Sequence, residues 1–432
     1  MDFKSYPSYK DSGVEWLGEV PEHWQQKPIW SLFSRIKRVN HPNEPLLSVY
    51  RDYGVILKDS RDDNHNRASE DLTPYQLVRP NDLVINKMKA WQGSIAISEY
   101  QGIVSPAYYV YEPKQPYCSK YIHFLIRSTY FIQSYKNFSK GIRVNQWDLE
   151  HDAFTHIDLL LPPLSEQNKI VSFLDTETSR IDHLIAKQEK LINLLEEHRK
   201  SVISHAVTKG LDPNVPMKDS GVEWLGEVPE HWYVTSVKRG FSVKLGKMLQ
   251  PEKNSENDVS KKYLKASNIS WNVISSTENE MWFSENDILQ LRLNKGDLLV
   301  TEGGDVGKSC IWDSTQEMYY QNSINRVRSK KHALNKFLYY WIFKLKSIGY
   351  IDILCNKATI AHFTAEKLNE MILLLPSKYE QNEIVNYLDE KTSKIDTLIA
   401  KQRELIAKLK KYRISIISHA VTGKIDVRDL VA

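Results

Sequence analysis

The chain has 432 residues, of which 41% are hydrophobic, 26% charged and 11% aromatic. This composition is typical of ordered protein and excludes a disordered or fibrous chain, and the length predicts two or three domains. The formal net charge of +4 permits a polyanionic partner without requiring one. Apolar runs are short and residues 1–10 are polar, so we expect no membrane span, no signal peptide and a cytoplasmic location.

Cysteine and histidine give no sign of metal chemistry. Cys118, Cys310 and Cys355 are far apart and lack the CxxC spacing of structural zinc sites. The 13 histidines are dispersed and form no HExxH motif. We therefore expect buried free thiols, structural or solvent-exposed histidines, and no metal site.

Two blocks of sequence occur twice. Residues 10–24 (KDSGVEWLGEVPEHW) recur unchanged at 218–232, and residues 166–212 match 380–426 at most positions. The stretches between the blocks are largely unrelated at the residue level. The chain is therefore a tandem duplication in which each half runs constant, variable, constant.

The short constant block contains two tryptophans, Trp16 and Trp24, among glycine and proline. We expect these indoles to anchor an irregular segment by packing, because tryptophan is usually highly buried. The alternative is a docking surface for a partner protein.

The variable segments mix strand-like and helical patterns. In the first half we expect two strands, the loop between them and a helix: 82–86, 94–98, 87–93 and 120–135. In the second half we expect two strands, their loop, a strand or turn, and a helix: 297–301, 309–312, 302–308, 320–328 and 334–347. Both segments read as one α+β domain type with different loops.

These loops are the candidate DNA interface, because loop tips on a shared scaffold can change without loss of the fold. Lysine and arginine can pair with phosphates, tryptophan can stack, and glutamine and asparagine can bond base edges. The first-half candidates are Lys87, Lys89, Trp91, Gln92, Arg143 and Asn145. The second-half candidates are Lys308, Asn322, Asn325 and Arg326. The alternative for each is an ordinary solvated side chain.

The long constant blocks predict helices. In residues 171–206 and 385–420 a seam of mainly apolar residues recurs at alternating spacings of three and four, the heptad pattern of a coiled coil. A helix of about 40 residues is roughly 60 Å long, too long for a small domain to cover its stripe. We expect the two helices to pack antiparallel about a pseudo-twofold axis, with Glu196 and Glu197 near Lys391 and Lys394.

No catalytic residue can be assigned. Residues 303–309 (GGDVGKS) resemble a phosphate-binding loop, but the glycine required five positions before Gly307 is Glu302. An acid there would oppose bound phosphates, so a tight turn between strands is the better interpretation. We find no GxSxG or GxGxxG motif and no paired acids of a hydrolase.

Five segments resemble the specificity (S) subunit of type I restriction-modification systems. They are the two DSGVEWLGEVPEHW blocks, PPLSEQNKIVSFLDTETSRIDHLIAKQEKLI from Pro162, EQNEIVNYLDEKTSKIDTLIAKQRELI from Glu380, and GIVSPAYYVY from Gly102. The resemblance implies an α+β chain with two target recognition domains joined by two spacer helices. The expected boundaries are 1–162 and 213–376 for the recognition domains and 163–212 and 377–432 for the helices.

The same resemblance implies a non-catalytic DNA-binding subunit that recognises a bipartite, asymmetric target in double-stranded DNA. It implies docking of two methyltransferase (M) subunits and, in the full complex, restriction (R) subunits. No cofactor is expected in this chain, while S-adenosylmethionine, ATP and Mg²⁺ are expected on the partners. The alternatives are a stand-alone DNA-modifying or DNA-cleaving enzyme and a coiled-coil scaffold that binds only proteins.

Overall fold

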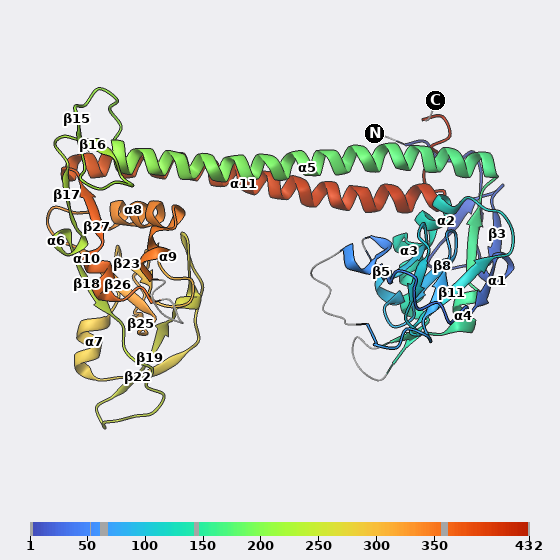
Figure 1. Ribbon diagram of the computed structural model, residues 1–432, viewed down its shortest axis with the longest axis horizontal. Helices are drawn as coiled ribbons and strands as arrows, with labels where there is room; N and C mark the ends of the chain where they lie inside the picture. Colours follow the sequence, from blue (N-terminus) through green and yellow to red (C-terminus); the bar gives the residue numbers. More distant parts are fainter. Residues whose placement is uncertain (1–2, 52, 61–67, 142–146, 356–361, 431–432) are drawn as a thin grey trace. The chain divides into compact units, whose positions relative to one another are not determined.

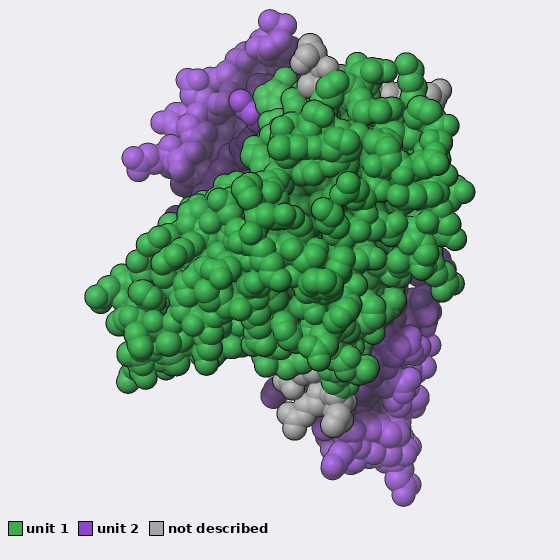
Figure 2. Space-filling model, turned by 90° about the vertical axis from the view of Figure 1, so that its right-hand side faces the viewer, with its two compact units in different colours: residues 1–188, 403–432 green, residues 189–402 purple. Residues whose placement is uncertain are grey.

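The computed structural model describes residues 3–51, 53–60, 68–141, 147–355 and 362–430. The chain divides into two compact units, shown in green and purple in Figure 2. Unit 1 comprises residues 1–188 and 403–432, and unit 2 comprises residues 189–402. Unit 1 is therefore built from both ends of the chain.

A four-stranded antiparallel sheet with strand order β4-β11-β8-β9 lies at the centre of unit 1 (Figure 1). Its strands are β4 (Phe33–Ile36), β11 (Tyr108–Pro113), β8 (Leu83–Asn86) and β9 (Ile95–Ile97). Leu83 and Ile85 face the main core, whereas Val84 faces a second cluster that contains Val49. Both faces of β8 are covered, which explains its unbroken apolar run.

The rest of unit 1 consists of short pairs of strands and short helices. The strand pairs are β1 (Tyr9–Asp11) with β2 (Glu19–Pro21), β3 (Gln25–Pro28) with β14 (Asp158–Leu161), β5 (Leu47–Tyr50) with β6 (Gly54–Leu57), β7 (Gln76–Val78) with β10 (Gly102–Val104), and β12 (Ser139–Lys140) with β13 (Asp148–Leu149). The helices are α1 (Ile29–Leu32), η1 (Lys58–Ser60), η2 (Ala90–Gln92), α2 (Ser119–Ile126), α3 (Thr129–Asn137) and α4 (His151–Thr155).

The single helix expected over residues 120–135 is wrong, because the chain forms α2 and α3 with a break between them. Ser128 has an extended conformation at the start of α3. The Thr129 N–H donates to Ser418 Oγ at 3.0 Å, a bond to a residue distant in sequence. This tertiary bond satisfies a helix-terminal N–H that the sequence pattern alone leaves unassigned.

Unit 2 contains a sheet of the same size and connectivity, with strand order β18-β26-β23-β24. Its strands are β18 (Phe241–Leu245), β26 (Ile324–Ser329), β23 (Leu298–Thr301) and β24 (Ser309–Ile311). The other strands are β15 (Met217–Asp219), β16 (Glu227–Pro229), β17 (Tyr233–Ser236), β27 (Ile372–Leu375), β19 (Val259–Leu264), β20 (Ile269–Ser270), β21 (Val273–Ile274), β22 (Glu280–Phe283) and β25 (Tyr319–Tyr320). The helices are α6 (Val237–Gly240), η3 (Ala266–Asn268), α7 (Glu285–Leu291), α8 (Asn335–Ser347), α9 (Tyr350–Cys355) and α10 (Ala365–Glu370). The long α8 packs against β23, β24 and β26 (Figure 1).

The registers of the two central sheets correspond strand by strand. Ile85 of β8 lies between Ile95 and Tyr109, and Val300 of β23 lies between Ser309 and Asn325. Tyr109 and Asn325 therefore hold the same place in their sheets. The chain is α+β, with two units that share this sheet topology.

Two long helices complete the units. Helix α5 (Leu164–Lys209) has 46 residues and α11 (Lys378–Val421) has 44. In unit 1 Arg413 of α11 donates to both Asp182 oxygens of α5, at 2.9 and 3.2 Å. In unit 2 Arg199 of α5 donates to Asp396 of α11 at 2.9 Å. Each unit thus joins an early part of one helix to a late part of the other.

Two of the four charged residues expected to lie near each other across the helices form ion pairs within their own helix. Glu197 bonds Lys200 on its own helix at 2.8 Å, and Lys394 bonds Glu390 on its own helix. In this region Arg199 of α5 reaches across to Asp396 of α11. The heptad pattern predicted the two long helices, whereas it left the pairing of flanking charges open.

The second tryptophan of each short constant block, Trp24 or Trp232, is anchored by a carboxylate on the first turn of a long helix. We call these two residues the entry tryptophans. Trp24 and Trp232 are completely buried, which confirms the packing role expected for the second indole of the block. The first indole is less enclosed, since Trp16 is half-buried and its counterpart Trp224 is exposed. The Trp24 indole N–H donates to Glu166 at 2.9 Å, and that of Trp232 donates to Glu380 at 3.1 Å. His23 and His231 contact the same carboxylates at 2.8 and 3.0 Å.

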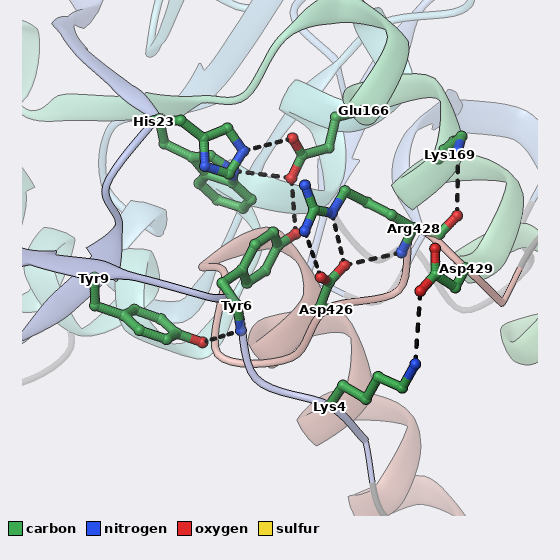
Figure 3. A network of polar contacts seen from close by, with 10 residues as sticks. Lys4, Tyr6, Tyr9, His23, Glu166, Lys169, Asp426, Arg428 and Asp429 are labelled. Atoms are coloured by element: carbon green, nitrogen blue, oxygen red, sulfur yellow. Dashed lines mark hydrogen bonds and ion pairs between the residues drawn. The ribbon is translucent and has the colours of Figure 1, made fainter.

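In unit 1 the two chain termini add to this anchor (Figure 3). The Tyr6 hydroxyl donates to Glu166 at 2.8 Å, and the Arg428 guanidinium lies 4.8 Å from the centre of the Tyr6 ring. Arg428 also donates to both oxygens of Asp426, whose own N–H donates to the Lys4 carbonyl at 2.8 Å. Burial alone would raise the pKa of Asp426, but the hydrogen bonds from Arg428 outweigh it and hold that pKa below its usual range.

The described residues can be compared with the expectations for the cysteines, for a metal site and for a membrane span. Cys310 and Cys355 are buried free thiols, and Cys118 is a half-buried one. The described part of the chain contains no cluster of three His, Cys, Asp or Glu side chains that could hold a metal ion. No helix among the described residues combines the length and apolarity needed to cross a bilayer.

We predict that Glu166→Ala lowers the local free energy of unfolding by about 3 kcal/mol, because it leaves the buried Trp24 and Tyr6 donors without an acceptor. Glu380→Ala should cost about 1 kcal/mol, because the Glu380 side chain is 27% exposed whereas that of Glu166 is 6% exposed. Amide hydrogen exchange of β2 and β16 measures the two effects separately. Glu189→Ala, at an exposed site on α5, is the control. Equal effects of the two anchor variants would contradict this ranking.

Candidate nucleic-acid interface

The first candidate element is the loop between β8 and β9, residues 87–93. It contains the short helix η2 and closes at Gly93, whose φ is +92°. A side chain at Gly93 would place its Cβ 2.8 Å from Ile132 Cδ1 of α3. The left-handed backbone favours glycine at this position, and a Cβ there would also have to displace the end of the Ile132 side chain.

Two of the four candidates in this loop already have partners within unit 1. Lys87 Nζ lies 3.1 Å from Asp148 Oδ2, and the Lys87 carbonyl accepts from the Leu149 N–H at 3.0 Å. The Trp91 ring packs against Trp147 with centroids 5.1 Å apart, and its indole N–H donates to the Met88 carbonyl at 3.1 Å. These contacts fasten the loop to the segment that leads into α4.

Lys89 and Gln92 are exposed, and both belong to this same loop. They are the first-half candidates whose side chains are most available to a phosphate and a base edge. Arg143 and Asn145 lie outside the described residues. The structure therefore brings together four of the six first-half candidates.

The corresponding loop of unit 2, residues 302–308, is rich in internal ion pairs. Lys308 lies 2.9 Å from Asp305, and Lys346 of α8 lies 3.1 Å from the same carboxylate. Burial alone would raise the pKa of Asp305, but hydrogen bonds from the two lysines outweigh it and keep the carboxyl ionised. Lys308 is thus paired with an acid within the loop, which agrees with the interpretation of this segment as a turn between strands.

The other second-half candidates divide into surface and interior positions. Asn322 is half-buried, and its backbone N–H donates to the Lys247 carbonyl at 2.8 Å. Asn325 is completely buried, and its amide donates to the Phe363 carbonyl at 2.9 Å. Arg326 is 6% exposed and donates to the Gln290 carbonyl at 2.8 Å.

Asn325 and Arg326 are therefore revised from DNA contacts to interior residues of unit 2. Arg326 pairs with Leu299 at the point where Val110 of β11 pairs with Val84, a position inside the sheet. Burial penalises the charged form of Arg326 and lowers its pKa. Hydrogen bonds from the guanidinium to backbone carbonyls offset part of this cost, so the fold tolerates the buried cation. Strand register, which determines these positions, is not visible in the residue pattern alone.

Sequence reasoning missed the partners of the loops. Asp148 and Trp147 in unit 1, and His362 in unit 2, hold the loops but were not selected. His362 Nδ1 contacts both Glu302 oxygens, at 3.2 and 3.3 Å. One signal was available: Asp148 and His362 lie at equal distances before Pro162 and Pro376, which end the two variable segments.

Comparison with known families identifies the type of protein. The model of the type I restriction-modification DNA specificity domain matches residues 21–195 and 229–410. The chain belongs to this family. The two matched segments include both central sheets and most of both long helices, so the family assignment covers each unit.

Two curated relatives match over most of their length. The type I restriction enzyme EcoKI specificity subunit of Escherichia coli (strain K12) is 23% identical over 442 aligned positions, which cover 94% of this chain and 90% of the relative. The MjaVIII specificity subunit of Methanocaldococcus jannaschii is 26% identical over 369 positions, which cover 82% of this chain and 81% of the relative.

Solved structures share the fold. A chain from a structural study of complex assembly in a type I R-M system has a TM-score of 0.69 at 14% identity and covers 93% of this chain and 98% of its own length. The HsdS subunit from Thermoanaerobacter tengcongensis has a TM-score of 0.55 at 16% identity and covers 96% of this chain and 100% of its own. At these identities the likeness establishes the fold.

We predict that Asn325→Ala lowers the local unfolding free energy of unit 2 by about 1–3 kcal/mol, because it removes the donor to a buried carbonyl. Gln92→Ala, at an exposed loop position, should change stability by less than about 0.5 kcal/mol. Hydrogen exchange of β26 and β9 reports the two effects. Unchanged exchange of β26 together with weaker DNA binding by Asn325→Ala would instead make Asn325 a DNA contact.

Proposed function

We propose that this chain is the DNA-specificity subunit of a type I restriction-modification complex. In this proposal unit 1 and unit 2 each read one half of a bipartite, asymmetric target in double-stranded DNA. The chain itself is non-catalytic, and methylation and cleavage belong to partner subunits. The family match over both units and the relatives that it resembles along most of their length support this role.

One observation carries the proposal of two different readers. The two central sheets share the same strand order, yet the loops between corresponding strands differ in sequence and charge. Lys87-Met88-Lys89-Ala90-Trp91 follows β8, whereas Glu302-Gly303-Gly304-Asp305 follows β23. Equal scaffolds with unequal loops suit two dissimilar half-targets, whereas identical readers would suit a palindrome.

We further propose that α5 and α11 form an antiparallel coiled coil that fixes the number of unread base pairs between the half-targets. The pairs Asp182–Arg413 and Arg199–Asp396 support it, because the duplicated blocks match Asp182 to Asp396 and Arg199 to Arg413. Such reciprocal pairs are what a pseudo-twofold axis between antiparallel helices would generate. Half-buried Arg199 and Arg413 would also favour one register.

The partners follow from the same arrangement. Equivalent surfaces on the two halves would accept two identical methyltransferase subunits, and restriction subunits would join them in the full complex. S-adenosylmethionine, ATP and Mg²⁺ would be bound by those partners, and the complex would act in the cytoplasm. The chain's small net charge of +4 fits this division, since partners can supply much of the charge that surrounds DNA.

The test is a comparison of genome-wide adenine methylation in cells that express the methyltransferase partner with and without this chain. We expect a methylated motif with two dissimilar halves and a fixed gap that occurs only when the chain is present. An unchanged methylation pattern would contradict the proposal.

Two purified-protein controls separate the alternatives. A stand-alone enzyme would cut or methylate DNA without partners when supplied with a divalent metal and S-adenosylmethionine. A protein-only scaffold would leave the assembled complex without sequence-selective, salt-dependent DNA binding. We expect neither outcome.

A further inference from the structure

Corresponding positions in the two units hold pairs of an acidic and a basic side chain in reversed order. Lys87 is the first residue after β8, and Glu302 is the first residue after β23. Their partners, Asp148 and His362, lie the same number of residues before Pro162 and Pro376. We call Lys87–Asp148 and Glu302–His362 the loop pairs.

Backbone bonds establish that the loop pairs occupy equivalent places. The Leu149 N–H donates to the Lys87 carbonyl at 3.0 Å, and the Phe363 N–H donates to the Glu302 carbonyl at 2.8 Å. Leu149 and Phe363, which directly follow Asp148 and His362, are both buried. Each unit therefore makes the same two-point attachment, one backbone bond and one side-chain pair, between its loop and the segment leading into α4 or α10.

Opposite polarity rules out a shared role for these residues as phosphate contacts. A lysine at position 87 could pair with a phosphate, but the glutamate at the corresponding position 302 would be repelled by it. What the two units have in common is the pairing itself. The distances between nitrogen and oxygen atoms support pairing as the shared feature. They are 3.1 Å in Lys87–Asp148 and 3.2 and 3.3 Å in Glu302–His362.

The attached loops carry the residues proposed to read DNA, and the attached segments lead directly towards the long helices. Through α4 and β14 the first segment continues into α5, and through α10 and β27 the second continues into α11. A loop held at this point has its position set relative to the sheet and to the strand that enters the helix. Without this attachment the first loop would still be held by β8, β9 and the Trp91–Trp147 contact, and the second by β23, β24 and the Asp305–Lys346 ion pair. Neither loop would then be bonded at its first residue to the segment that leads into α4 or α10.

We propose that the loop pairs are positioning residues, each of which holds one reading loop in the geometry required for discrimination of its own half-target. This inference rests on the proposed function. It assigns Lys87 and Glu302 to loop placement rather than to DNA contact. Lys89 and Gln92 remain the exposed candidates for contact in the first loop.

The test uses the full-length chain assembled with its methyltransferase partners and measures dissociation constants for three kinds of duplex. One duplex carries the complete target found by methylation mapping, and the others carry a substitution in one half or the other. Lys87→Glu should lower discrimination at one half-target about fivefold, since surface pairs contribute up to about 1 kcal/mol and like charges repel. Discrimination at the other half-target should stay within about twofold.

Rescue distinguishes positioning from contact. Lys87→Glu combined with Asp148→Lys restores the pair with reversed polarity, as unit 2 already has it, and should return discrimination to within about twofold of the original. Glu302→Lys should affect only the opposite half-target, and His362→Glu in the same chain should rescue it. Lys89→Glu is the matched charge control, and it should weaken binding to all three duplexes about equally.

Three outcomes would overturn the proposal. The first is equal weakening of all duplexes by Lys87→Glu, the second is failure of both reversed pairs to restore discrimination, and the third is unchanged discrimination in every variant. The milder Asp148→Asn, checked by hydrogen exchange of β9, replaces any variant that unfolds the loop, and it should lower discrimination at the same half-target. If the unaltered complex discriminates at neither half, the proposed function itself fails and this inference with it.

Discussion

A hydrogen bond from an entry tryptophan to the first turn of a long helix joins the two ends of the variable segment in each unit. Trp24 donates to Glu166, and Trp232 donates to Glu380. The tryptophan precedes the variable segment and the glutamate follows it, so one bond closes the variable segment into a loop. The different domains inserted between these points can therefore change without altering how they join the helices.

The two anchors are chemically related but unequally buried. In unit 1 the carboxylate of Glu166 also accepts from Tyr6, and the guanidinium of the C-terminal residue Arg428 lies beside it and is bonded to Asp426 (Figure 3). In unit 2 the chain runs continuously from α5 into β15, and Ser377 supplies the additional contact to Glu380 at 3.3 Å. Unit 1 therefore depends on contacts from both chain ends. Because Glu166 is buried, separating the ends would leave buried polar groups without hydrogen-bond partners, which costs free energy.

Much of the architecture could be predicted from the sequence, because periodicity and repetition are local signals. The heptad seam gave the two long helices, and the unbroken apolar runs gave β8 and β23 with small errors at their ends. The break between α2 and α3 could not be predicted, because it depends on a bond from Thr129 to Ser418. The interior location of Asn325 and Arg326 was equally hidden, since it follows from the pairing of β26 with β18 and β23. The loop pairs depend on residues about sixty positions apart, and their polarity reverses between units, so no shared motif marks them.

The spacer role proposed for the long helices places a fixed length of helix between two different readers of DNA. Its most direct test duplicates one heptad in each helix, residues 185–191 of α5 and 399–405 of α11, which preserves the seam. Each helix then lengthens by about 10 Å, and we predict that the gap in the methylated target grows by about three base pairs while both half-targets stay the same. A methylated target whose gap is unchanged would contradict the account.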